Sequence, residues 1–287
     1  MTSQLFAPQA FISPLAIGDA VRNALAEDLG RAGDVTSIAT VPEGTLGRAV
    51  VVARKAGTIA GLPLVETSFK TIDPSIKIEG HARDGVTVVA KTPLMTVAGE
   101  ARAILAAERV ALNFIGHLSG IASATAEFVR RIAHTRARVC CTRKTTPGLR
   151  ALEKYAVRCG GGFNHRFGLD DAAMVKDNHV QAAGGIGPAV ARLRAGLGHM
   201  VRIEVEVDRL EQLEEALGLC VDRILLDNMS LDDLRRAVAL AKGKAVLEAS
   251  GNVTLTTVRA IAETGVDYIS SGAITHSAPN LDIGLDF

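Results

Sequence analysis

The feature that most constrains the fold is a repeated pattern in the second half of the chain. Short apolar runs recur there, each ending in a polar or reactive residue and usually followed by a segment with helical periodicity. The runs cover residues 138–142, 172–175, 201–207, 222–226, 244–249 and 267–270, and predicted helices lie at 208–218, 231–241 and 253–263. Strands and helices in alternation predict parallel βα units. Near-continuous apolar strands indicate a sheet that is buried on both faces.

Such units form either an open doubly wound sheet or a barrel. A dinucleotide-binding sheet would carry a G-x-G-x-x-G run after a strand, and no such run follows a predicted strand here. In a βα barrel the strand ends converge on one rim, where active sites form. Because the region 115–275 is shorter than the roughly 200 residues that a full barrel needs, we predict an α/β fold with an incomplete barrel. Its rim would carry Arg143-Lys144, Lys176, Glu206, Asp227, Ser250-Gly251-Asn252 and Ser271-Gly272.

The first half of the chain has a mixed pattern that reads as an α+β layer. A helix is predicted over 14–28, with Ser13 as N-cap, Pro14 as first residue and one apolar face made of Ile17, Val21 and Leu25. A second helical segment is predicted at about 61–71, among strand-like runs at 48–53, 75–79, 86–90 and 94–98. The long helical stretch 100–133 is predicted as two helices broken near Ser119-Gly120.

Positive charge concentrates in one stretch although the chain is nearly neutral. The 287 residues include 32 Lys/Arg and 31 Asp/Glu, a balance that argues against a general nucleic-acid or membrane-surface binder. Residues 136–179 nevertheless hold nine Lys/Arg against four Asp/Glu. Arg143-Lys144 and His165-Arg166 lie among Gly, Thr and Pro, which favours binding of a small polyanion. Arg150, Lys154 and Arg158 have helical spacing, which fits the solvated face of a helix.

The cysteines, the N-terminus and the apolar runs bear on the cellular compartment of the protein. The four cysteines form no C-x-x-C pair, which favours reduced thiols in the cytoplasm over a zinc site. The N-terminus lacks the basic stretch of a signal peptide, and no window approaches the ~18 apolar residues of a membrane span.

Three short segments carry groups suited to anion binding. In Thr142–Gly148, Thr146 is predicted as an N-cap and Pro147 as the first helical residue, which would place two cations at a helix N-terminus. Residues 160–166 combine three glycines, which allow close approach of the backbone, with the donors His165 and Arg166. Lys176 begins the third segment, Lys-Asp-Asn-His. Each segment could also be an ordinary turn.

Carboxylates are predicted on the same rim. Glu204 and Glu206 share one strand face and Asp227 ends the next strand. An inward carboxylate needs a partner, which leaves open salt bridges to the lysines and arginines, Mg²⁺, or sugar hydroxyls. The turns 250–252 and 270–272 are of the kind at which barrels bind phosphate. Since no Ser-His-Asp arrangement or histidine cluster stands out, the rim is predicted to hold a highly anionic substrate pair and to stabilise charge.

Long motifs in the correct order resemble the quinolinate phosphoribosyltransferase family. The strongest is TRKTTPGLRALEKYAVRCGGGFNHRFGLDDAAMVKDNHV at 142–180, and the others include AEDLGRAGDVTS at 26–37, AERVALNFIGHLSGIA at 107–122, IEVEV at 203–207, ILLDNMS at 224–230, LEASGNV at 247–253 and the last 19 residues, 269–287. One departure is visible: Cys141 stands where the family commonly has Asp, so no role of that Asp is carried over.

The resemblance implies an N-terminal open α/β sandwich domain, residues 1–114, on which the tail 277–287 packs, followed by a TIM-like incomplete α/β barrel domain, residues 115–276. It implies transfer of phosphoribose from phosphoribosyl pyrophosphate to quinolinate, with Mg²⁺, to give nicotinate mononucleotide, pyrophosphate and CO₂ in NAD biosynthesis. It also implies a homodimer, or a hexamer of dimers, in which Arg109 completes the partner's site. The excess of cations favours the dicarboxylate quinolinate over nicotinate.

The resemblance also implies roles for residues. Catalysis would rest on Lys144, Lys176, Glu206 and Asp227, with Glu206 and Asp227 facing ribose hydroxyls and Mg²⁺, directly or through substrate. Quinolinate would be held by Thr142, Arg143, Lys144, His165, Arg166 and Lys176, with Lys144 also serving pyrophosphate. The 5′-phosphate would be held by Ser250, Gly251, Asn252, Ser271 and Gly272.

Three other functions are compatible with parts of the sequence. A Schiff-base aldolase would place a lysine at a strand end, but the surrounding cations favour polyanion binding. A relative linked to molybdate transport shares the Arg-Lys-Thr run but is expected to lack Lys-Asp-Asn-His, which is present at 176–179. In a non-catalytic nucleic-acid binder, the rim carboxylates would repel the phosphate backbone.

Overall fold

A computed structural model describes residues 5–8 and 10–287. The chain divides into two compact units. The first contains residues 1–126, 145–161 and 277–287, and the second contains residues 127–144 and 162–276. Helix α4 (Ala101–Ile132) supplies residues to both units.

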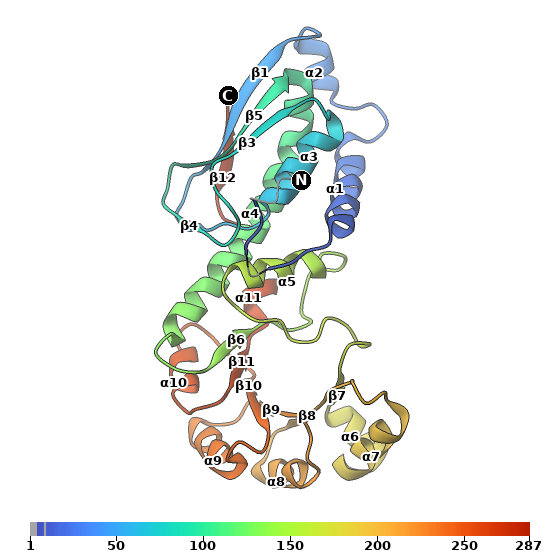
Figure 1. The fold of residues 1–287 in the computed structure, drawn as a ribbon, viewed down its shortest axis with the longest axis vertical. Coiled ribbons are helices and arrows are strands. Elements are labelled where there is room, and N and C mark those ends of the chain that lie inside the picture. Colours follow the sequence, from blue (N-terminus) through green and yellow to red (C-terminus); the bar gives the residue numbers. More distant parts are fainter. Residues whose placement is uncertain (1–4, 9) are drawn as a thin grey trace. The chain divides into compact units, whose positions relative to one another are not determined.

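An antiparallel sheet forms the centre of the first unit (Figure 1). Its strand order is β12-β1-β5-β3, with bounds Ile283–Asp286, Leu46–Ala53, Thr92–Glu100 and Lys77–Gly80. The pairing of β12 with β1, from Val50 opposite Asp286 to Ala53 opposite Ile283, ties the last residues of the chain to this sheet. A separate two-stranded ribbon pairs β2 (Gly57–Thr58) with β4 (Thr87–Val88). The helices of this unit, besides α4, are α1 (Pro14–Leu29), α2 (Val35–Thr40), α3 (Leu62–Ile72) and α5 (Arg150–Cys159).

The core of the first unit lies between the sheet and two helices. Alternate residues of β1, Ala49, Val51 and Ala53, are fully buried, as the two-residue period of a strand requires. They pack in one cluster with apolar side chains of α3 and α4, among them Phe69 and Ile104. The sheet therefore buries one face against helices.

Helix α1 confirms the sequence prediction. The Ser13 hydroxyl accepts a hydrogen bond from the Leu15 amide, Pro14 is the first residue, and Gly30 ends the helix at φ 54°. The predicted apolar face is buried, at Ile17, Val21 and Leu25.

The prediction of a break near Ser119-Gly120 is wrong, because α4 runs unbroken through both residues. Ser119 uses its hydroxyl to bond the backbone amide and carbonyl of Ala60, at 3.0 and 3.2 Å. Gly120 lets another segment approach, since a Cβ there would lie 2.2 Å from the Pro279 carbonyl oxygen. The two small residues therefore serve packing rather than helix termination.

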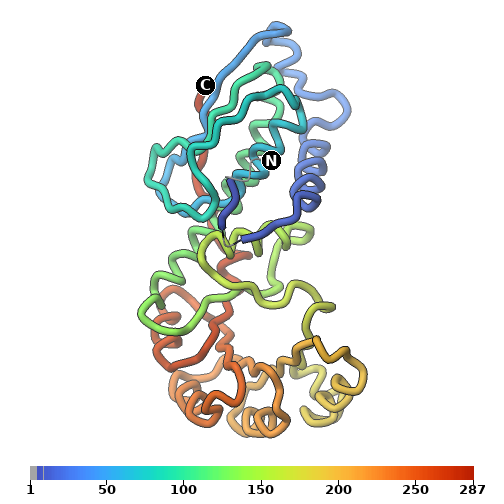
Figure 2. The backbone as a smooth tube through the Cα atoms, in the orientation of Figure 1, coloured from blue at the N-terminus to red at the C-terminus, as the bar shows by residue number. Residues whose placement is uncertain are grey.

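A six-stranded parallel sheet forms the second unit, in the order β6-β11-β10-β9-β8-β7. In that order the strands are Arg138–Cys140, Tyr268–Ser270, Val246–Ser250, Arg223–Asp227, Ile203–Val207 and Ala173–Val175. The helices are α6 (Asp177–Ala183), α7 (Ile186–Gly196), α8 (Leu210–Gly218), α9 (Leu231–Ala241), α10 (Val258–Ala262) and α11 (Ala273–His276). Strands β6 and β7 lie at opposite edges of the sheet, and α6 to α10 follow the curve of the sheet on its outer side (Figure 2). This unclosed α/β sheet confirms the prediction of an incomplete barrel.

Two local predictions for the segment after β6 are wrong. Helix α5 begins at Arg150, not at Pro147, and Leu149 rather than Thr146 is its N-cap. Gly148 has φ 81°, which a helix cannot contain, and the Leu149 amide closes a turn onto the Thr146 carbonyl. Lys154 is also not on a solvated face, because only 2% of it is exposed.

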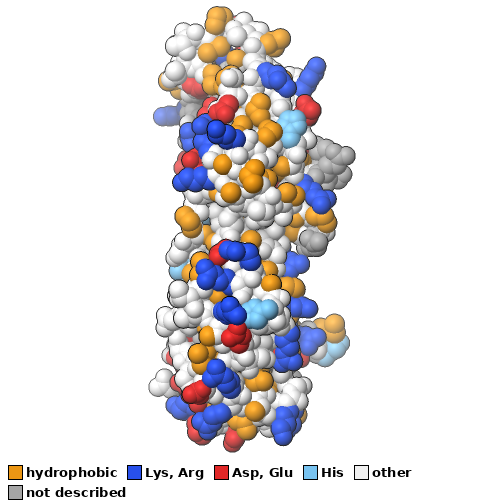
Figure 3. All heavy atoms as spheres, turned by 90° about the vertical axis from the view of Figure 1, so that its left-hand side faces the viewer, with side chains coloured by type: hydrophobic (Ala, Val, Ile, Leu, Met, Phe, Trp, Pro, Cys, Tyr) orange, Lys and Arg blue, Asp and Glu red, His pale blue; other side chains and the backbone are white. Residues whose placement is uncertain are grey.

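The surface agrees with the balanced charge. On the face drawn in Figure 3, Lys and Arg are interspersed with Asp, Glu and apolar side chains rather than joined into one basic field. Among the described residues, none of the four cysteines forms a disulfide. No helix in the described part of the chain is both long enough and apolar enough to cross a membrane.

Candidate active site

A cavity of about 790 Å³ opens at the carboxyl ends of the strands of the second unit. Parallel strands present their carboxyl ends on one side of a sheet, and sites form there. Residues at the ends of, or just after, β6, β7, β8, β9, β10 and β11 all contribute to the wall, with Glu206 lying inside β8. The lining residues are Thr142–Lys144, His165, Arg166, Met174, Lys176, Glu206, Leu225, Asp227, Asn228, Glu248, Ser250–Thr254, Ser270–Ala273 and His276.

Four cations line this cavity: Arg143, Lys144, Arg166 and Lys176. Lys144 follows β6 and Lys176 follows β7, so the lysines come from the two edge strands of the sheet. Burial and then the neighbouring Arg143 guanidinium lower the pKa of Arg166. Two guanidinium groups held this close disfavour each other until an anion lies between them.

The segment that carries Lys144 is fixed through its backbone. The Lys144 amide donates to the Thr142 hydroxyl at 3.0 Å, and the Lys144 carbonyl accepts from the Thr275 hydroxyl at 2.7 Å. The Lys144 side chain passes over Gly272, where a Cβ would lie 2.9 Å from its Cδ. Gly272 therefore leaves the room in which this lysine lies.

Glu206 and Asp227, on neighbouring strands, are two of the three carboxylates that line the cavity, and Glu248 is the third. Glu206 forms an ion pair with the Lys176 ammonium group. Asp227 accepts a hydrogen bond from the Asn228 side chain at 2.8 Å. The salt bridge that the sequence left open is thus present at Glu206, while both acids still face the cavity.

The turn after β10 has a backbone that few residues adopt. Gly251 and Asn252 both have positive φ, 94° and 49°, and a Cβ on Gly251 would lie 2.2 Å from Oδ1 of Asn228. Asn252 donates to the same oxygen at 3.1 Å. Successive backbone amides in such a turn form an anion-binding concavity. In the turn after β11, the buried Ser271 hydroxyl instead donates to the Val253 carbonyl at 3.2 Å.

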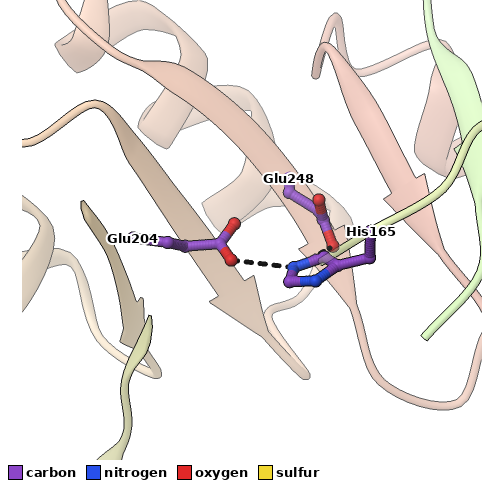
Figure 4. A group of neighbouring side chains, drawn as sticks. All are labelled: His165, Glu204 and Glu248. Carbon is purple, nitrogen blue, oxygen red and sulfur yellow. Dashed lines mark hydrogen bonds and ion pairs between the residues drawn. The ribbon is translucent and has the colours of Figure 1, made fainter. Parts of the chain in front are cut away.

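A buried cluster lies beside the cavity, where Glu204 from β8 and Glu248 from β10 converge on the ring of His165 (Figure 4). The distance from Nε2 of His165 is 2.8 Å to Glu204 and 3.7 Å to Glu248. Burial, and then repulsion from the Glu204 carboxylate, raise the pKa of Glu248. Burial first and Glu248 next also raise the pKa of the adjacent Cys140 thiol, which favours the neutral thiol.

The donor atoms of this cluster lie within 4.8 Å of one another, a spacing at which they could hold a metal ion. The ring chemistry does not fit a metal. Nδ1 of His165 accepts the Arg166 amide at 2.8 Å, so the proton of the neutral ring is on Nε2. Nε2 would have to give up that proton to ligate a metal. Glu206 and Asp227 are the better match to Mg²⁺, which prefers carboxylate and phosphate oxygens.

Comparison with known proteins agrees with this geometry. Residues 34–119 match the N-terminal domain, and residues 121–286 the C-terminal domain, of quinolinate phosphoribosyl transferase. The chain belongs to the quinolinate phosphoribosyltransferase family. It is 47% identical over 283 residues to a probable nicotinate-nucleotide pyrophosphorylase (carboxylating) of Synechocystis, covering 97% of this chain and 95% of the relative.

Other members of the family are similarly close. A probable nicotinate-nucleotide pyrophosphorylase (carboxylating) of Bacillus subtilis is 45% identical, over 91% of this chain and 89% of the relative. The crystal structure of NadC from Streptococcus pyogenes superimposes with a TM-score of 0.93 at 40% identity, covering 96% of this chain and 98% of that chain. The chain is thus a phosphoribosyltransferase enzyme of NAD biosynthesis.

The structure brings most of the predicted site residues of this family together. Every one of them except Arg109 lines the cavity of the second unit. Arg109 is an exposed residue of α4 in the first unit.

Sequence reasoning missed Glu248 and Asn228, and left Glu204 without a role. A signal for Glu248 existed: it lies two residues before Ser250 on a strand, so both side chains point to the same face. Cys141, where the family commonly has Asp, is buried and donates from Sγ to the Asn164 side chain at 3.3 Å. It is absent from the cavity lining, so the departure affects the support of the 162–166 segment.

Proposed function

We propose that this cavity transfers phosphoribose from phosphoribosyl pyrophosphate to the ring nitrogen of quinolinate, with loss of CO₂. The observation that carries the proposal is the presence of four Lys and Arg side chains together with the carboxylates of Glu206 and Asp227 in the lining of one cavity. A dicarboxylate and a triply phosphorylated sugar bring many negative charges to one place, and a cation-rich pocket offsets their repulsion. The carboxylates of Glu206 and Asp227 would stabilise the positive charge that develops on the sugar.

The quinolinate carboxylates would bind to Arg143, Arg166 and Lys176, with His165 and Thr142 beside them. Guanidinium groups bind carboxylates in a fixed, bidentate geometry. Two arginines and a lysine match two carboxylates better than one. This is the physical basis for preferring quinolinate over nicotinate.

The sugar would lie along β8 to β11. The turn at 250–252 and the residues Ser271 and Gly272 would hold the 5′-phosphate, with amides of positive-φ backbone as donors. Glu206 and Asp227 would hold the ribose hydroxyls and stabilise the cationic character of C1 as the ring nitrogen attacks. Lys144 would receive the charge of the leaving pyrophosphate.

Mg²⁺ fits this site through Glu206 and Asp227, directly or through substrate oxygens. When bound, it supplies positive charge that stabilises the leaving pyrophosphate. Glu206 also forms an ion pair with Lys176, so this carboxylate would be shared between Mg²⁺ and the lysine.

Decarboxylation follows from the same charge arrangement. Once the ring nitrogen is bonded to C1 of the ribose it is positively charged, and this charge stabilises the electron pair that stays on the adjacent ring carbon when the bond to its carboxylate breaks. A proton from solvent replaces the lost CO₂. The chain's own residues need only orient the ring and keep the other carboxylate bound.

We infer a cytoplasmic homodimer in which Arg109 reaches the partner's site. Arg109 is exposed on α4, as contact with a partner requires, and cysteines that form no disulfide are usual in the cytoplasm.

The test is a product assay with quinolinate, phosphoribosyl pyrophosphate and Mg²⁺, in which nicotinate mononucleotide is separated by chromatography. We expect product that disappears when Mg²⁺ is chelated and returns when it is restored. No product from folded protein would overturn the proposal. An imine trapped by borohydride with a carbonyl substrate would favour the aldolase instead.

A further inference from the structure

Two acidic side chains, Glu204 next to the cavity and Glu248 in its lining, have no part in the reaction described above. Glu204 is 5% exposed and Glu248 is 1% exposed. Buried carboxylates destabilise a protein unless hydrogen bonds or charges compensate them. Their position next to a site for anions is doubly unfavourable, because they repel the substrate. Their role therefore depends on the group that these two carboxylates contact.

What they hold is the ring of His165. Nε2 of the ring donates to Glu204 at 2.8 Å, and Glu248 lies 3.7 Å from the same nitrogen (Figure 4). Nδ1 accepts the backbone amide of Arg166 at 2.8 Å. An amide only donates, so Nδ1 carries a lone pair and the ring is the neutral Nε2–H tautomer.

We propose that Glu204 is a positioning residue: with Glu248 packed against the His165 ring, Glu204 fixes the ring so that its Nδ1 holds the Arg166 amide, and thereby presents the Arg166 guanidinium to the substrate carboxylate. This inference rests on the proposed function. It gives His165 a positioning role in addition to the contact with quinolinate that the family resemblance implies.

The backbone around Arg166 needs such support. The chain from Asn164 to Ala172 has neither a helix nor a strand, and the last sheet-type pairing before it is the bridge between Phe163 and Cys140. Arg166 is instead held at two points, by its amide on His165 and by Nη1 on the Ala172 carbonyl at 2.9 Å. Two points of attachment keep the guanidinium beside Arg143 despite the repulsion between them.

Two variants at Glu204 distinguish the effect of its hydrogen bond from the effects of its charge and its size. Glu204→Gln keeps an acceptor oxygen for Nε2–H, whereas Glu204→Leu keeps the size and removes the acceptor. We expect Glu204→Leu to raise KM for quinolinate about tenfold to a hundredfold, the effect of losing a hydrogen bond to a charged group. KM for phosphoribosyl pyrophosphate should stay within about twofold, and Glu204→Gln should rescue most of the loss. Glu248 lies 3.7 Å from Nε2, too far for a hydrogen bond, so Glu248→Leu should raise KM for quinolinate less than Glu204→Leu does.

The control is an ion pair of the same chemistry outside the cavity. His134 and Glu263 lie 3.0 Å apart and both are exposed. Glu263→Gln and Glu263→Leu should leave both KM values unchanged. If Glu204→Gln is as impaired as Glu204→Leu, the role is one of charge and the proposal fails. It also fails if both substrates are affected equally and the melting temperature falls in parallel.

Nitrogen-15 NMR of the histidines tests the ring directly and needs no turnover. His165→Asn identifies the His165 signals. We expect the neutral Nε2–H tautomer near neutral pH in the wild type and in Glu204→Gln, and a mixture of tautomers in Glu204→Leu. An Nδ1–H tautomer or an imidazolium in the wild type would overturn the inference. A wild type that shows the expected tautomer but no turnover would instead refute the proposed function.

Discussion

Lys144 and Lys176 are the two residues whose chemistry the account depends on most. They extend into the cavity from the ends of the two edge strands of the parallel sheet, and neither is deeply buried. Their ammonium groups are therefore available for the pyrophosphate and the dicarboxylate rather than for the core.

Replacing either lysine by alanine should lower kcat by roughly a hundredfold or more, because each removes charge stabilisation that the transition state uses. Thermal unfolding should change little, since side chains this exposed contribute little to stability. Lys244→Ala, an exposed lysine in the same unit, is the matched control. Near-normal turnover in both site variants would contradict these roles.

At this scale the sequence predicted well wherever a residue ends a strand, because strand ends converge by geometry alone. It predicted poorly where a side chain's partner decides its role. Glu248 was passed over because its partner, His165, lies far away in the chain. The predicted cap at Thr146 failed because the positive φ of Gly148 is not visible in a helical pattern.

At the scale of elements, Gly272 couples β11 to the segment after β6. A Cβ at this position would lie 2.9 Å from Lys144 Cδ and 3.1 Å from His276 Cδ2. Gly272→Ala should therefore displace Lys144 and lower kcat by roughly tenfold or more, with a small effect on stability. Gly196→Ala, at the end of α7 with open space around the added methyl group, should have no effect on kcat. Equal kinetics for both variants would show that the close approach is unimportant.

Helix α3 depends on a buried carboxyl outside the second unit. Asp84 accepts the Gly61 and Leu62 amides at 2.9 and 3.1 Å, and the Tyr155 hydroxyl at 2.7 Å. It thus satisfies the first amides of α3 and joins α3 to α5. Burial raises the pKa of Asp84 from 3.8 to about 7, although the three hydrogen bonds oppose the shift.

The sign of the resulting pH dependence is defined. Between pH 3.8 and about 7 the folded protein retains a proton that the unfolded chain has lost, so this group's contribution to stability falls as the pH rises through that window. Urea unfolding across this range should show that Asp84→Asn lacks this decline. At pH 4 the variant should be less stable by roughly 1–3 kcal/mol, because an NH₂ group then faces backbone donors. Tyr155→Phe should cost about 1 kcal/mol. A decline that persists unchanged in Asp84→Asn would assign it to other groups.

The elements themselves were largely predictable from apolar periodicity, since strands β8 to β11 and their helices follow the expected spacing. The continuity of α4 through Ser119 and Gly120 was not predictable in this way. A Ser-Gly pair signals a break only when nothing packs on it, and here the Pro279 and Ala60 backbones do. That information lies at distant positions in the chain.

At the scale of the whole molecule, the proposed dimer makes a specific prediction. If Arg109 completes the partner's site, Arg109→Ala and Lys176→Ala lesions lie in different subunits of any one site. Mixing the two inactive variants under subunit exchange should restore up to about a quarter of wild-type activity, because a mixed dimer has one intact site. Mixing Lys144→Ala with Lys176→Ala should restore none. No recovery in the first mixture would show that each chain forms its site alone.

The broad organisation of the chain was visible in its sequence because the two hydrophobic patterns differ, mixed at first and then βα. The antiparallel pairing of β12 with β1 could not be derived from pattern, since it joins residues at least 230 positions apart.

The central claim is that the cation-rich cavity selects a dicarboxylate and decarboxylates it. The most direct measurement supplies quinolinate, labelled in the carboxylate next to the ring nitrogen, and nicotinate in parallel reactions with phosphoribosyl pyrophosphate and Mg²⁺. The account predicts equal amounts of labelled CO₂ and nicotinate mononucleotide from quinolinate, and little nucleotide from nicotinate. Equal use of nicotinate, or nucleotide formed without CO₂, would contradict it.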